Sequence, residues 1–316
     1  MKKYTLITLT IIAMALTINT FTAQAAFKDT GWGTRPAGMG GAFVAVANDS
    51  NAPLWNPAGI AQMKNAEGSF MYSTYYNGLD LKAGNDTVSL GFNYLSFVYP
   101  KSSIGAFGVS WANFTASNLY KEDTYVITYA KRLNDWFPGL TPKVYVGVNL
   151  KSMGHAYTLD DYAKDDPVFA SGNSKSAFSA DIGTLIKPYD KICIGLVAKN
   201  LTQPDVGLKD TDKVPMEILA GVAYRNINLG NTILTPAADF SMRDGVSTYH
   251  LGLESWLFGK SLGLRAGFNS TEATFGFSFD GLRSQALGLN IDYSFIMPLQ
   301  IASSSGSHRV SLGIWF

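Results

Sequence analysis

Three histidines, a group of aspartates and one cysteine are the side chains of this sequence most suited to chemistry. His155, His250 and His308 lie far apart, without the spacing of a metal site. No Ser, His and Asp set stands out as a catalytic triad. Four aspartates between residues 160 and 166 could bind Ca²⁺, but their spacing is not that of an EF-hand, and a solvated loop is the alternative. We therefore expect no catalytic residue, no metal site, no cofactor and no enzymatic activity.

The composition favours a chain in which apolar and polar residues alternate. Of the 316 residues, 47% are hydrophobic, 13% aromatic and only 16% charged. Charged residues usually make up about a quarter of a soluble domain, so this fraction is low. The net charge of +1 gives no reason to expect nucleic acid as a partner. The single cysteine, Cys193, excludes an intramolecular disulfide.

The first 25 residues have the pattern of a secretory signal peptide. Lys2 and Lys3 precede an apolar run, residues 6–16, and Ala23-Gln24-Ala25 supplies the small residues of a cleavage site. An uncleaved helical anchor is the alternative, which the short run disfavours. No later stretch of about 20 apolar residues could form a transmembrane helix. An exported chain of amphipathic strands is expected in the bacterial outer membrane.

The last nine residues, 308–316, alternate with a period of two. One row is apolar: Val310, Leu312, Ile314 and Phe316. The other row is Arg309, Ser311, Gly313 and Trp315. This period is typical of a strand with two different faces. An apolar terminal strand would invite aggregation in a soluble sandwich, which is the alternative, whereas a membrane barrel pairs it with the first strand. The segment therefore predicts the closing strand of a transmembrane β-barrel.

Similar alternation over residues 66–316 predicts an all-β, antiparallel barrel of about fourteen strands. The expected strands include 87–99, 191–201 and 216–227. An even number of strands places both barrel ends on the periplasmic side, where the connections should be short. Two connections fit poorly, because 133–142 is long for the periplasm and the turn after 261–269 is short for the outside. One miscounted strand would explain either.

Charged residues within the strands indicate which face points inward. An arginine on the lipid face at the bilayer midplane costs about 2–4 kcal/mol, so Arg265 is expected in the lumen. The same argument, with one residue from the segment before the barrel, gives a lumen charge network: Arg35, Arg225, Asp239, Glu254, Arg265, Asp292 and Arg309. Mixed signs favour a network that braces the wall. A charged constriction that selects ions is the alternative.

Residues 26–65 do not alternate and are rich in glycine, which allows close backbone approach. We expect a hatch or plug inside the lumen, with a periplasmic tail as the alternative. The expected hatch and gating residues are Gly38, Gly40, Gly41, Asn56, Pro57 and Ala58. Phe43, Val44 and Trp55 are weaker candidates for lining a ligand pocket, and packing of the plug onto the wall is their other interpretation.

The stretch Thr34–Asp49, T-R-P-A-G-M-G-G-A-F-V-A-V-A-N-D, is followed by Trp55-Asn56-Pro57-Ala58-Gly59. Together with Asp292–Phe295 and Gly306–Leu312, this stretch resembles PorV/PorQ-like outer-membrane proteins of the FadL-like barrel superfamily. The resemblance implies a fourteen-stranded barrel with an N-terminal hatch. It also implies relatives that are fatty-acid or aromatic-hydrocarbon channels, or components of type IX protein secretion.

Two functions follow from these expectations. The first is a plugged passive channel for small hydrophobic molecules of the fatty-acid or hydrocarbon class. The alternative is a non-transporting partner barrel of a type IX-like secretion apparatus, with proteins docking on the outer loops near residues 157–174 and 202–215. A general open porin is disfavoured by the plug. The expected partners are outer-membrane lipid together with either a hydrophobic small molecule or secretion-system proteins.

Overall fold

The computed structural model describes residue 27 and residues 31–83, 86–101, 104–283, 287–301 and 303–316. The predicted signal peptide, residues 1–25, lies outside the described residues. No helix in the described part of the chain has the length and apolar character that crossing a membrane requires.

The chain folds into one large antiparallel sheet of 15 strands. Leaving out the three-residue strand β11 (Ile227–Leu229), fourteen strands of eight residues or more remain within the described residues. These are β1 (Glu67–Tyr75), β4 (Leu90–Lys101), β5 (Gly105–Ala116), β6 (Tyr120–Arg132), β7 (Lys143–Tyr157), β8 (Ser174–Tyr189), β9 (Ile192–Lys199), β10 (Glu217–Tyr224), β12 (Thr232–Arg243), β13 (Val246–Leu257), β14 (Leu262–Asn269), β15 (Glu272–Arg283), β16 (Gly288–Pro298) and β17 (Ser307–Trp315).

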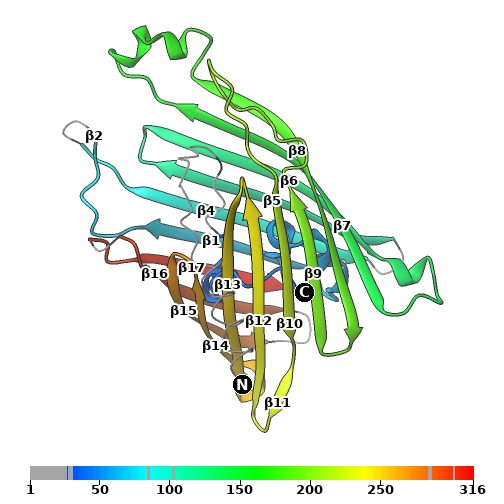
Figure 1. The fold of residues 1–316 in the computed structure, drawn as a ribbon. Coiled ribbons are helices and arrows are strands. Elements are labelled where there is room, and N and C mark those ends of the chain that lie inside the picture. The colour runs from blue at the N-terminus through cyan, green and yellow to red at the C-terminus, as the bar shows by residue number, and fades with distance from the viewer. Residues whose placement is uncertain (1–26, 28–30, 84–85, 102–103, 284–286, 302) are drawn as a thin grey trace, which may run out of the picture.

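The sheet is closed into a barrel. Each long strand pairs with the next one along the chain, and β1 pairs with β17, which lies beside it in Figure 1. At this seam Phe70 lies opposite Leu312, and the C-terminal Phe316 exchanges backbone hydrogen bonds with Ala66. Closure removes the free edge that an apolar terminal strand would otherwise present. The predicted fourteen-stranded antiparallel barrel is confirmed.

Burial alternates along the strands. On β14, Leu264 and Phe268 are 44% and 52% exposed, whereas Arg265 is 4% exposed. On β13, Leu251 and Leu253 are exposed and Glu254 is buried. Apolar side chains therefore cover the outside of the barrel and charged ones lie inside it, as the cost of a charge in lipid requires.

Several strands end differently from the prediction. The strands β2 (Lys82–Ala83) and β3 (Asp86–Thr87) pair in a separate small sheet, and β4 begins only at Leu90. Strands β9 and β10 are shorter than expected, because Asn200 and Asn226 adopt positive φ angles of 55° and 58° that a strand cannot continue.

Both connections whose lengths fitted the expected barrel poorly are present in the structure, and neither contains a further strand. Residues 133–142 contain the short helix η2 (Leu133–Asp135), and the β14–β15 connection is a tight turn. Three other short helices lie in connections between strands: η3 (Ala163–Asp165), η4 (Pro167–Phe169) and η5 (Phe258–Lys260). We call the end of the barrel where β1 begins the near end, and the opposite end the far end.

The N-terminal segment, residues 31–65, lies inside the ring of strands, where Figure 1 shows it in blue. It consists of three short helices joined by turns: α2 (Thr34–Gly38), α3 (Ala52–Trp55) and η1 (Pro57–Gln62). The main hydrophobic cluster combines this segment with inward-facing residues of the wall, such as Val98, Leu185 and Cys193. The core of the molecule is therefore the interface between the segment and the barrel.

Closure predicts which cysteine pairs can be oxidised to a disulfide. In the variant with Phe70→Cys and Leu312→Cys, the two residues face each other across the β1–β17 pair and should form a disulfide. In the matched control, Phe70→Cys with Ile291→Cys, residue 291 lies one strand further away and should not react. Non-reducing electrophoresis after copper-phenanthroline oxidation measures the outcome. An unreactive first pair, or equal reaction of both pairs, would contradict closure.

Candidate functional site

Arg35 of α2 makes four hydrogen bonds inside the barrel. Its Nε and Nη2 donate to the two carboxylate oxygens of Glu254 on β13, both at 2.7 Å. Its Nη1 donates to Asn48 and to Asp49, each at 2.8 Å. Burial disfavours the charge of the Arg35 guanidinium, but the carboxylates of Glu254 and Asp49 outweigh this effect and raise its pKa above the ordinary value. This bidentate pair ties the N-terminal segment to the wall.

The same network continues along the wall. Arg265 on β14 donates through Nε to Glu254 at 2.8 Å and through Nη1 to Asp292 on β16 at 3.4 Å. Asp292 also accepts hydrogen bonds from Ser278 and Ser311 on the flanking strands. The strands β13, β14 and β16 and the helix α2 are thus linked through alternating charges, and this pairing makes their burial tolerable.

The remaining predicted lumen charges contact the segment separately. Asp239 on β12 accepts the backbone N–H groups of Phe43 and Val44 at 2.6 and 2.7 Å. Arg309 on β17 donates to the carbonyl of Gly31, and Arg225 donates to the side chain of Gln62 at 2.7 Å. The structure therefore joins Arg35, Glu254, Arg265 and Asp292 in one network, and it places the other three at separate anchoring points.

Asn56 lies at the kink before η1 and is fully buried. Its Nδ2 donates to the carbonyl of Val44 at 3.0 Å and to the carbonyl of Thr184 on β8 at 3.1 Å. Its Oδ1 accepts the N–H of Ala58 at 3.1 Å, so the side chain caps η1, which begins at Pro57. The Asn56-Pro57-Ala58 kink is therefore held by contacts both within the segment and with the wall.

The three predicted hatch glycines lie against β13, β14 and β15. Gly40 and Gly41 have φ angles of 64° and 83°, which favour glycine. The carbonyl of Gly40 accepts a hydrogen bond from His250 Nδ1 at 2.8 Å, and the carbonyl of Gly38 accepts one from Thr274 at 3.1 Å. In this structure the glycines allow a tight turn to contact the wall.

Five glycines of the wall strands, which we call the glycine belt, allow the N-terminal segment to pack directly against the strand backbones. They are Gly147, Gly183, Gly195, Gly252 and Gly267, on β7, β8, β9, β13 and β14. A Cβ added at Gly267 would lie 2.1 Å from the backbone nitrogen of Gly40, and one at Gly195 would lie 2.4 Å from the carbonyl oxygen of Val44. The segment therefore packs against the strand backbones with no room for a side chain between them. Glycines on the inward row of a strand were the available sequence signal.

The predicted ligand-lining residues face the wall. Phe43 and Val44 are fully buried, and Trp55 is 5% exposed. The Trp55 indole donates to the carbonyl of Trp32 at 2.7 Å, and its ring packs edge-on against Phe43. These three residues present almost no surface to a ligand.

A group of inward-facing aromatic residues, which no sequence pattern indicated, lies between the N-terminal segment and the far end of the barrel. The ring centroid of Trp32 lies 4.3 Å from that of Phe92 on β4. Phe92 in turn contacts Tyr75 on β1 and Phe114 on β5. Trp32 and Phe114 are partly exposed, so this aromatic cluster has surface available to a ligand. Among the described residues, no group of three or more His, Cys, Asp or Glu could hold a metal ion.

The glycine belt predicts the effect of adding one side chain. Gly267→Leu should displace the N-terminal segment, because the leucine would occupy the space of Met39 and Gly40. The control Ala266→Leu adds the same bulk on the neighbouring exposed position of β14. Thermolysin should then cleave within residues 42–47 of the Gly267→Leu barrel and not of the control. Heat-dependent electrophoretic mobility verifies that both barrels are folded, and equal protection of the segment in two folded barrels would contradict the prediction.

Solved structures with a similar fold come from membrane channels. The fold matches a monoaromatic hydrocarbon channel, CymD, with a TM-score of 0.59 at 13% identity over 92% of this chain and 98% of the other. It matches the Pseudomonas putida toluene transporter TodX with a TM-score of 0.57 at 10% identity, over 90% and 96% of the two chains. A Pseudomonas aeruginosa FadL homologue gives 0.52 at 14% identity, over 90% and 97%. At these identities the similarities show the fold alone, a β-barrel like that of the FadL homologue and the two hydrocarbon transport proteins.

The sequence itself identifies the family. No curated protein matches the chain significantly. A family model described as type IX secretion system membrane protein PorP/SprF matches residues 50–314. This family comprises secretion proteins and not enzymes, in agreement with the sequence analysis. The narrower resemblance to PorV/PorQ-like proteins is not confirmed and stays a prediction. The chain belongs to the PorP/SprF family of type IX secretion system membrane proteins.

Proposed function

We propose that this protein is a partner barrel of a type IX secretion apparatus in the bacterial outer membrane. Residues 1–25 direct export, residues 26–65 close the lumen as a plug, and residues 66–316 form the barrel that contacts lipid. The barrel contributes binding surfaces at its two ends and does not conduct solutes. Membership of the family supports a place in a type IX secretion system. The tight packing of the lumen supports a binding role without passage of solutes.

The packing of the N-terminal segment is the observation that carries this proposal. Met39, Ala42, Phe43, Val44, Ala45 and Ala47 have no exposed surface. A side chain without exposed surface has no water-sized space beside it, whether outside or in an internal cavity. The glycine belt and the Arg35 network hold these residues in place, so opening a path here would break buried ion pairs.

The far-end loops supply candidate docking surfaces. Residues 158–173 carry η3 and η4, with Tyr162 92% exposed and Val168 40% exposed. Residues 200–216 are anchored, since Val206 and Val214 are each 1% exposed and pack on Phe27 and Met153. A loop that displays apolar groups and a second loop that is held in place both suit the binding of protein. A docking role of the PorV type is part of this proposal.

A second candidate function is passage of a small hydrophobic molecule. It is favoured by the aromatic cluster around Trp32 and Phe92, which faces the far end of the lumen. The similar structures named as hydrocarbon and toluene channels have the same fold. This function would require the segment to move away from the glycine belt.

Deletion of the gene in its own host distinguishes the two candidates. We expect lost secretion of at least one type IX cargo and unchanged uptake of labelled fatty acid and toluene, both restored to normal by the wild-type gene. Complementation with Tyr162→Ser and Val168→Ser should lower secretion severalfold, because exposed aromatic residues dominate protein interfaces. The control Tyr189→Ser, at a 72% exposed near-end tyrosine, should not. Normal secretion with reduced uptake would contradict the proposal and support the channel.

A further inference from the structure

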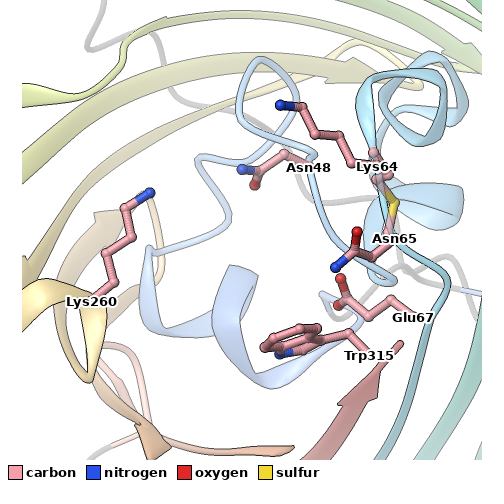
Figure 2. A pocket seen from close by; sticks show the side chains of 7 residues that line it. Asn48, Lys64, Asn65, Glu67, Lys260 and Trp315 are labelled. Atoms are coloured by element: carbon pink, nitrogen blue, oxygen red, sulfur yellow. The ribbon is translucent and has the colours of Figure 1, made fainter. Parts of the chain in front are cut away.

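A polar crevice opens at the near end of the barrel, between the N-terminal segment and the strands. Its volume is about 490 Å³, within the range of ligand pockets. It is lined by Asn48, Met63, Lys64, Asn65, Glu67, Lys260 and Trp315. Figure 2 shows Lys64 and Lys260 projecting into it from opposite sides, with Asn48 between them. The residues come from three parts of the chain that only barrel closure brings together.

The floor of the crevice is fixed by contacts already present. Asn48 accepts a hydrogen bond from Arg35 at 2.8 Å. Glu67 accepts hydrogen bonds from the backbone N–H and the hydroxyl of Ser50 at 3.0 and 2.9 Å. The Trp315 ring covers Gly288 of the neighbouring strand, where a Cβ would lie 1.9 Å from the ring. A site whose polar groups are already held loses little entropy when a ligand binds.

The two lysines are the groups left to bind something. Within the described residues, neither Lys64 nor Lys260 has a hydrogen bond or an ion pair, and both are exposed. Among the described residues that line the crevice, Glu67 is the one acid, and its carboxylate already accepts hydrogen bonds from Ser50. The crevice therefore has two ammonium groups over it and suits a ligand that carries carboxylates or another anionic group.

Charge across the whole near end supports the same polarity. The basic residues with described side chains at its strand ends and connections are Lys64, Lys101, Lys131, Arg132, Lys143, Lys187, Lys191, Arg225 and Lys260. The acidic ones are Glu67, Asp135, Asp190 and Asp280. At the far end the balance is reversed, because residues 158–173 and 200–215 together hold seven acidic and three basic residues. An acidic partner is therefore attracted to the near end and repelled from the far end.

We propose that this crevice is a docking site for an acidic segment of a partner protein, with carboxylates paired to Lys64 and Lys260. It lies inside the strand ring, since its walls include Asn48 of the N-terminal segment and Trp315 of the inward row. This position favours a peptide over the headgroups of lipids, which surround the outside of the barrel. The inference rests on the proposed docking role and gives that role a place and a partner chemistry.

Peptide binding to the purified full chain in detergent tests this site. The probe is a fluorescein-labelled octapeptide of alternating aspartate and glycine, and its control alternates lysine and glycine. We expect saturable binding of the acidic probe alone, weakened by salt. Lys64→Glu with Lys260→Glu should weaken binding by about tenfold or more. The control Lys175→Glu with Lys209→Glu makes the same charge change on exposed far-end lysines and should stay within about twofold.

The proposal would be overturned if the wild type showed no saturable binding, or if both double variants weakened binding equally. It would also be overturned if peptide binding were lost in phosphatidylglycerol nanodiscs, because that result would assign the lysines to lipid. If peptide binding fails while the gene deletion still abolishes secretion, the crevice is excluded as the docking site and the proposed function stands.

Discussion

The buried ion pair between Arg35 and Glu254 is the interaction on which the rest of the structure depends. It joins the N-terminal segment to a network that runs from Glu254 on β13 through Arg265 on β14 to Asp292 on β16. Removing one member of such a buried network costs about 3–5 kcal/mol, because a buried charge loses its partner. For Arg35 that charge is the Asp49 carboxylate, since Glu254 also pairs with Arg265. That amount is a large share of the roughly 5–15 kcal/mol that typically stabilises a folded domain. The pair therefore fixes whether the lumen is filled.

Close backbone packing and polar contacts together hold the N-terminal segment against the wall of the barrel. The glycine belt lets the segment approach the strands closely, and the approach brings Asp239 within 2.6 Å of the Phe43 N–H. With the lumen occupied in this way, the two ends of the barrel, acidic at the far end and basic at the near end, are the surfaces that we propose for binding protein. The chain belongs to a secretion-system family and has a fold shared with a channel, and both findings are consistent with a barrel that anchors other proteins.

The sequence predicted the barrel because alternation is a local property. The fourteen strands and the inward position of Arg265 follow from the period of two and from the cost of a charge in lipid. The early ends of β9 and β10 did not follow, because Asn200 and Asn226 take a left-handed conformation that the alternation gives no sign of. The partners of Arg35, the contacts of Gly267 and the meeting of Lys64 with Lys260 depend on which strands close around the segment. No local pattern contains that information.

Hydrogen exchange of the backbone amides of residues 42–47 tests the central claim most directly, in the wild type and in Arg35→Met. If the ion network holds the segment in the lumen, the wild-type amides should exchange as slowly as those of the barrel strands. Arg35→Met should accelerate them by about two to four orders of magnitude, the equivalent of the free energy lost with one buried partner. Fast exchange in the wild type, or equal protection in Arg35→Met, would contradict the account.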